Sequence, residues 1–179
     1  MNRFIFLDLE TTGLDVEVDQ ITEAAWCFRS DDDNVVEGLG SRRYFVEHTR
    51  LPNEWVLTKT DYLTRIAPAK KVPFSTVAAA LWNDCRGRET TYLVGACIAF
   101  DDSFLRKAFR ASCNLTLPYN YHVIDIEAMA MGALGHDAPC HLKELRAALG
   151  IAGENEAPHT ALGDALEVET IWRALRAPS

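Results

Sequence analysis

The first part of the chain is apolar at nearly every position before Asp8 and polar after it, which is typical of a buried β-strand that ends there. Two more stretches of β-branched, aromatic and small apolar residues follow, between segments that contain Asp and Gly. Strands are therefore expected at residues 3–9, 20–28 and 42–47. The acidic residues 31–34 are expected to form a turn or the tip of a hairpin.

Farther along the chain, apolar residues recur every three to four positions, a spacing that predicts α-helices. Helices are expected at residues 74–85, about 101–112, 127–134, 142–149 and 161–176, and strands at 92–95 and 122–126. Three early strands followed by strands that alternate with helices indicate an α/β fold. We expect a mixed five-stranded sheet, with an antiparallel N-terminal meander and parallel C-terminal strands, flanked by helices. Residues 1–179 are expected to form a single domain.

The composition, 48% hydrophobic and 25% charged, is that of an ordinary globular protein. No apolar run approaches the roughly 20 residues that cross a bilayer. The short apolar stretch before Asp8 also lacks the length and cleavage site of a secretory signal. We therefore expect a cytoplasmic protein with no membrane partner.

The five cysteines are odd in number and widely spaced, which argues against a disulfide framework and a zinc ribbon. Only the stretch His136-Asp137-x-x-Cys140-His141 resembles a metal cluster. We interpret it as a polar loop that leads into the helix expected at residues 142–149.

The net charge of −8 is unusual for a partner of nucleic acid, because phosphate binding is usually accompanied by a basic surface. A site that gathers four carboxylates would account for half of this excess, and bound divalent cations would reverse its local sign. The charge fits an enzyme that handles one strand end better than a protein that grips a duplex.

Asp8 and Glu10 stand where the first strand ends, and strand alternation puts them on the same face as Phe4 and Phe6. Their Cα atoms are then roughly 6–7 Å apart. Two partly buried carboxylates this close raise each other's pKa unless a cation keeps them ionised. The alternative is that the strand simply runs out into solvent at Asp8.

Two of the expected helices carry a carboxylate on their apolar side. Asp101 is the first residue on the buried face of its helix, whereas Asp102 is rotated away from that face. The alternative role for Asp101 is to complement the helix dipole. In the last helix, Asp164 lies at the edge of an apolar stripe, where a lone ionised carboxylate is costly. Glu167 and Glu169 are expected outside this stripe.

His159 can converge with Asp164 only if it lies upstream of the last helix, with Thr160 as the N-cap. A lone histidine is more often a surface or packing residue. Four carboxylates and one histidine together, however, suit two-metal phosphodiester hydrolysis. Mg²⁺ or Mn²⁺ prefers hard oxygen ligands, a metal pair can activate water and stabilise the leaving 3′ oxygen, and a histidine can accept the proton of that water.

Three stretches resemble the motifs of the DEDDh exonucleases, the DnaQ-like family of polymerase proofreading subunits, ribonuclease T and oligoribonuclease. They are Phe6-Leu-Asp8-Leu-Glu10-Thr-Thr-Gly13-Leu14, Ala99-Phe100-Asp101-Asp102-Ser103-Phe104-Leu105 and His159-Thr-Ala-Leu-Gly-Asp164. They occur in the order of the family and span nearly the whole chain. Each alone is a weak signal, but the combination is specific.

The resemblance implies a ribonuclease-H-like fold and the release of nucleoside monophosphates from a 3′ end. It implies that His159 is the general base and that two Mg²⁺ or Mn²⁺ ions are bound by Asp8, Glu10, Asp101 and Asp164. It also implies that Thr11 and Leu14 contact the terminal nucleotide, with the leucine as a wedge against its base. Phe104 would line the same pocket or pack in the core. The chain departs from the family at Ala96-Cys97, where His-Asn is common, so no substrate contact is carried over to those positions.

The resemblance also bears on substrate and partners. Thr11-Thr12 after Glu10 is more typical of the DNA-proofreading branch than of the oligoribonuclease branch, so single-stranded DNA is the expected substrate and RNA processing the alternative. A non-catalytic nucleic-acid-binding domain is disfavoured because all five catalytic positions are filled. The length resembles that of oligoribonuclease-like dimers, which suggests a homodimer. Because the chain ends at Ser179 without a tail for tethering, we expect a free-standing enzyme that would serve a DNA polymerase in trans.

Overall fold

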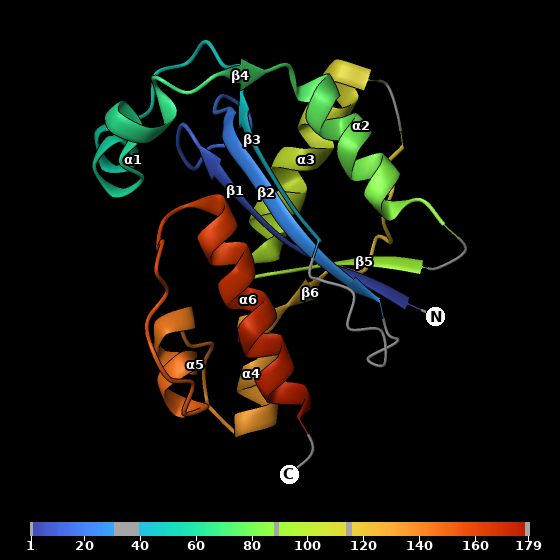
Figure 1. Cartoon of the computed structure of the whole chain (residues 1–179), viewed down its shortest axis with the longest axis vertical. Coiled ribbons are helices and arrows are strands. Elements are labelled where there is room, and N and C mark those ends of the chain that lie inside the picture. The colour runs from blue at the N-terminus through green and yellow to red at the C-terminus, as the bar shows by residue number, and fades with distance from the viewer. Residues whose placement is uncertain (1, 31–39, 88–89, 114–115, 178–179) are drawn as a thin grey trace.

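Six strands form one mixed sheet in the computed structural model of the chain, which describes residues 2–30, 40–87, 90–113 and 116–177 (Figure 1). The strand order is β4-β3-β2-β1-β5-β6. The strands are β1 (Asn2–Thr11), β2 (Ile21–Ser30), β3 (Gly40–Val46), β4 (Lys71–Val72), β5 (Thr90–Gly95) and β6 (Ile124–Asp125). β1, β2 and β3 pair antiparallel, whereas β5 is parallel to β1 and β6 is parallel to β5. The predicted antiparallel meander and parallel C-terminal strands are therefore confirmed.

The sheet has one strand more than expected. β4 contains two residues and pairs parallel with β3. Two residues are too few to show the alternation that reveals a strand in a sequence, and this strand exists because β3 offers its edge. The turn expected at residues 31–34 lies outside the described residues.

Helices cover both faces of the sheet (Figure 1). α2 and α3 pack on one face, and α4, α5 and α6 pack on the other. The helices are α1 (Glu54–Lys59), the π-helix η1 (Tyr62–Ile66), α2 (Phe74–Cys85), α3 (Ile98–Cys113), α4 (Ile126–Leu134), α5 (Leu142–Ala148) and α6 (Ala161–Arg176). All five predicted helices are present, and α1 and η1 are additional. Within the described ranges, no helix is long and apolar enough to cross a membrane.

β1 separates two cores because its side chains alternate between the faces of the sheet. Ile5, Leu7 and Leu9 are buried against α2 and α3. Phe6 is buried on the other side, where its ring lies 5.8 Å from that of Trp172 in α6. The residues that continue the Phe6 side toward the end of β1 therefore point to the start of α6.

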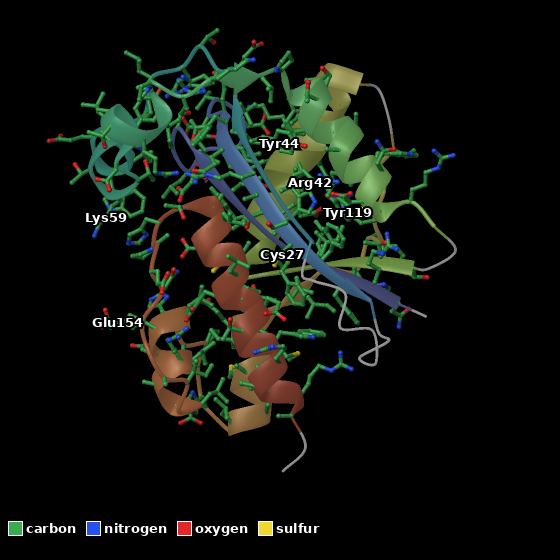
Figure 2. All side chains as sticks on the ribbon, in the orientation of Figure 1. Cys27, Arg42, Tyr44, Lys59, Tyr119 and Glu154 are labelled. Carbon is green, nitrogen blue, oxygen red and sulfur yellow. The ribbon has the colours of Figure 1, made fainter. Side chains whose placement is uncertain are left out.

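α6 lies against the same side of the sheet. Cys27 of β2 faces it, and its Sγ donates to the carbonyl of Ala165 at 3.7 Å (Figure 2). The buried surface of α6 is wider than predicted, because Glu167 and Glu169 are buried rather than outside the apolar stripe. Arg146 of α5 pairs with Glu167 at 2.5 Å, so a partner on another helix compensates for the burial of that carboxylate.

α3 begins at Ile98, three residues before its expected start. Asp101 therefore lies within the first turn of the helix rather than at its opening. The inner stripe predicted for this helix is confirmed, since Phe104, Leu105 and Phe109 are fully buried against the sheet.

Candidate active site

Three carboxylates converge where β1 ends and α6 begins. Asp8 and Glu10 leave β1 on the same face, and Asp164 lies in the first turn of α6. One oxygen atom of each lies within 4.8 Å of the others. All three are partly buried, so water screens their mutual repulsion only weakly.

Asp101 joins this cluster from the first turn of α3. It is buried, and its Oδ1 accepts a hydrogen bond of 2.9 Å from the backbone N–H of Leu9. Leu9 stands between Asp8 and Glu10, so this bond holds the fourth carboxylate against the strand segment that carries the first two. The four carboxylates predicted from separate segments are thus brought together.

The electrostatics of the cluster disfavour four free negative charges. Burial, followed by the charge of Asp101, raises the pKa of Asp8 well above its usual value. Burial and then the neighbouring Glu23 raise the pKa of Glu10 to about 8. Burial likewise raises the pKa of Asp101 and of Asp164. Without a cation, Glu10 would hold its proton at neutral pH, and burial favours the protonated form of the other three.

His159 lies upstream of α6, as predicted, and Thr160 is the N-cap, whose Oγ1 accepts from the N–H of Gly163 at 3.1 Å. The N–H of His159 donates to Oδ2 of Asp164 at 3.1 Å. The other oxygen of Asp164 accepts from Nδ2 of Asn155 at 2.9 Å. The carboxylate is therefore oriented on both sides, while the side chain of His159 is exposed beside it.

A cavity of about 580 Å³ opens next to the carboxylates. Asp8, Asp164 and His159 line one part of it, and residues of α4, α5 and the loop after α5 line the rest. Its volume is in the range of small-molecule and nucleotide sites.

The three residues expected to contact a terminal nucleotide differ from one another in exposure. Leu14 is 72% exposed in the loop after β1, where an apolar side chain is free to contact a ligand. Thr11 is buried, and its hydroxyl donates to the carbonyl of Gly13 at 2.6 Å, so it shapes that loop. Phe104 is 1% exposed and packs in the core, which favours the packing alternative for this residue.

Two residues near the cluster were not predicted from the sequence. Glu23 on β2 is the register partner of Glu10 across the β1–β2 pair and is fully buried. It forms ion pairs with Arg43, at 2.7 Å, and with Arg65 of η1. The signal for Glu23 was a charged residue inside an otherwise apolar strand. Arg65 gave no such signal, since an arginine in a polar segment is ordinary.

The donor set suits hard divalent cations. Carboxylate oxygens are the ligands that Mg²⁺ and Mn²⁺ prefer, and positive charge would relieve the repulsion that raises the pKa values. At the stretch considered earlier for zinc, His136 Nδ1 lies 2.9 Å from Cys140 Sγ. Within the described part of the chain, no group of three potential ligands gathers there.

The fold is that of known exonucleases. The chain matches E. coli exonuclease I in its zinc-bound complex with single-stranded DNA at a TM-score of 0.75 and 22% identity, and in its complex with a dA16 oligonucleotide at 0.73 and 20%. Both matches cover 98% of this chain, but only 40% and 41% of those chains. This chain therefore spans about two fifths of the length of the structures that it resembles. No curated protein sequence matches it.

The sequence itself matches the family model described as Exonuclease over residues 5–171. This range contains all three of the recognised motifs, the four converging carboxylates and His159. The match confirms the predicted resemblance and, together with the acidic cluster, the dependence on divalent cations. The chain belongs to the exonuclease family.

Proposed function

We propose that this protein acts as a 3′–5′ exonuclease that releases nucleoside monophosphates from the end of single-stranded DNA, with residues 1–179 as one catalytic domain. The observation that carries the proposal is the convergence of Asp8, Glu10 and Asp164 within 4.8 Å in a chain of this family. Asp101, held on the backbone of Leu9, supplies the fourth carboxylate.

The four carboxylates would hold two ions, Mg²⁺ or Mn²⁺. When bound, the ions would supply an activated water and stabilise the leaving 3′ oxygen. The protein contributes a rigid set of oxygen donors from three elements, β1, α3 and α6. Because the bonds to Leu9, His159 and Asn155 orient two of these carboxylates, little reorganisation is needed on binding.

His159 is proposed as the general base. Its imidazole is exposed at the cavity beside Asp164, and its backbone N–H is bonded to that carboxylate. A neutral imidazole there can accept the proton of the attacking water. Asp164 then has two proposed roles, as a metal ligand and as the group that fixes where the histidine stands.

Leu14 is proposed as the wedge against the terminal base, because it is a strongly exposed apolar side chain four residues after Glu10 in the loop that follows β1. Thr11 would support it through its bond to Gly13. Single-stranded DNA is favoured over RNA by Thr11-Thr12, and two of the exonuclease I structures that share the fold are complexes with single-stranded DNA or a dA16 oligonucleotide. A cytoplasmic location, a homodimeric state and a DNA polymerase served in trans belong to the same proposal.

Two labelled oligonucleotides of equal sequence, one DNA and one RNA, test the proposal. With Mg²⁺ or Mn²⁺, the 5′-labelled DNA should shorten one nucleotide at a time, and a 3′-labelled copy should lose its label as a mononucleotide. EDTA should stop both reactions. Faster degradation of RNA would transfer the proposal to an RNA-processing enzyme, and binding without hydrolysis of either strand would contradict it.

A further inference from the structure

One guanidinium group joins three segments at the edge of the acidic cluster. Arg65, in η1, donates from Nε and Nη2 to the carbonyl of Thr60 at 3.0 and 2.9 Å. Its Nη1 pairs with the buried carboxylate of Glu23 on β2. Its Nη2 also donates to the carbonyl of His159 at 3.1 Å. Arg65 therefore links the end of α1, the sheet and the loop that carries the proposed base.

His159 needs such a link because its backbone is strained. Its φ angle is 57°, in the left-handed region, which is unfavourable for a residue other than glycine because Cβ comes too close to the following carbonyl oxygen. A conformation of this kind persists only where the surroundings impose it. The N–H of His159 is held by Asp164, and its carbonyl by Arg65. The peptide groups on both sides of its Cα are thus fixed, and with them the direction of the Cα–Cβ bond from which the imidazole projects.

We propose that Arg65 is a positioning residue for His159, and that it acts on the reaction by holding the left-handed backbone from which the imidazole projects. The inference rests on the proposed role of His159 as the general base. A π-helical turn around Arg65 is consistent with it, since single turns of this kind occur often at functional sites.

Arg65 could also influence the reaction through its charge. It acts directly on Glu10, whose pKa burial raises and the guanidinium lowers, and Arg65→Lys keeps that charge. It also acts by a further route, through the charge of Glu23, which stands opposite Glu10. The chain provides a control for this route. Arg43 pairs with the same carboxylate, Nε to Oε1 at 2.7 Å, but it has no hydrogen bond to His159 within the described structure. Removing either arginine leaves Glu23 with one cationic partner. Only the removal of Arg65 releases the carbonyl of His159.

The first test compares Arg65→Gln with Arg43→Gln in oligonucleotide hydrolysis. Loss of an outer-shell partner at a metal site typically lowers activity about 10- to 100-fold, and Arg65 in this way holds His159, which is hydrogen-bonded to the proposed ligand Asp164. We expect a loss of this size in kcat for Arg65→Gln, with KM within about threefold, because the substrate still binds. Arg43→Gln should keep kcat within about threefold of the parent. Equal losses in both variants would overturn the proposal in favour of the charge of Glu23.

The second test is a double-variant cycle. If Arg65 acts through the imidazole, Arg65→Gln should not lower the residual rate further when His159 is already alanine. The same fold-loss in both backgrounds would overturn the proposal.

Melting temperature and calorimetric Mn²⁺ binding show whether each variant is folded and keeps its metal site. Should Arg65→Gln fail to fold, Arg65→Lys keeps the charge but lacks the fork that reaches two carbonyls, and it should show the same dependence on His159.

The two proposals fail differently. Full activity of His159→Ala would rule out His159 as the general base, and with it the proposed role of Arg65, but would leave the family assignment intact. Loss of activity in His159→Ala, together with parent kcat in Arg65→Gln, would remove only the role of Arg65.

Discussion

At the residue scale, Asp164 lies partly buried beside His159, where hydrogen bonds from His159 and Asn155 orient its carboxylate, so its removal changes chemistry more than packing. We expect His159→Ala to lower kcat by about 10²–10⁴-fold, the usual contribution of a general base, and Asp164→Ala to lose at least as much. Both should remain folded, because the exposed imidazole and the partly buried carboxylate contribute little to the core. Hydrolysis by either folded variant at the parent rate would show that the site is assigned wrongly.

Asp101 and Asp102 are neighbours with opposite expected effects. Asp102 faces away from the cluster and accepts from Nε of Arg106 at 2.7 Å and from the hydroxyl of Tyr119 at 2.9 Å. Asp102→Ala leaves the buried hydroxyl unpaired, so it should lower the free energy of unfolding by about 1–3 kcal/mol. The rate of the folded enzyme should stay near that of the parent.

Asp101→Ala should show the reverse, a large loss of rate with a smaller change in stability. The substitution removes the bond from the N–H of Leu9, but it also removes a charge that adds to burial in raising the pKa of Asp8 and Glu10, and the two effects on stability oppose each other. Chemical denaturation and initial rates on the same samples separate the two effects. Similar loss of activity from both substitutions would mean that function does not depend on which side of α3 each carboxylate lies.

At the element scale, α3 holds the loop that carries Leu14. Nζ of Lys107 donates to the carbonyls of Val16, Glu17 and Asp19 at 2.5, 3.0 and 3.0 Å. Lys107→Met keeps the length of the side chain but frees the loop. If Leu14 contacts the terminal base, KM for an oligonucleotide should rise about three- to tenfold, the equivalent of roughly one hydrogen bond, with kcat changed less.

A matched variant separates this effect from a general loss of lysine contacts. Lys71 donates to the carbonyl of Ala67 at 2.8 Å, remote in sequence from the Leu14 loop. Lys71→Met should therefore leave KM near the parent value. A fall in kcat at constant KM in Lys107→Met would indicate that the loop serves catalysis rather than binding.

Long elements with a clear period were predictable and short ones were not. α2 has the predicted bounds, Phe74–Cys85, because five apolar side chains at helical spacing describe its buried face. α1 has six residues, and although Asn53 caps its N-terminus, a single turn and a half shows little periodicity. β4 has two residues and depends on β3, a partner distant in the sequence.

The same limit applies to the site. The faces of β1, α3 and α6 indicated where Asp8, Glu10, Asp101 and Asp164 would point, because local periods determine them. Glu23 and Arg65 meet across 42 residues, and Arg65 and His159 across 94, so no local pattern could reveal these contacts. The burial of Glu167 likewise depended on Arg146, 21 residues away.

At the scale of the whole molecule, part of the net charge of −8 is concentrated where it opposes folding. The pKa of Glu10 is about 8 in the folded protein against 4.5 ordinarily, with burial as the main cause. The folded state therefore holds this proton more tightly than the unfolded chain. The resulting stability is fully present below pH 4.5 and is lost as the pH rises to about 8.

Bound cations should reverse this trend, since they bind the ionised carboxylates of the folded state. We expect the metal-free protein to melt at a lower temperature at pH 8 than at pH 5.5, and Mg²⁺ or Mn²⁺ to raise the melting temperature more at pH 8. His48 opposes the first effect, because burial lowers its pKa and its own contribution grows as the pH rises through 6.5.

Glu10→Gln isolates the cluster from such other groups, because His48 is common to both proteins and cancels in the difference. Glutamine keeps the shape of Glu10 but carries no charge, so the metal-free variant should melt above the parent at pH 8, by about 5 °C or more. The difference should shrink as the pH falls and disappear below pH 4.5, where Glu10 is protonated in both the folded and the unfolded chain. The variant should also lose most of the stabilisation by Mn²⁺ and most of the nuclease activity. A variant less stable than the parent at pH 8 would mean that Glu10 contributes more through its contacts than it costs through its charge.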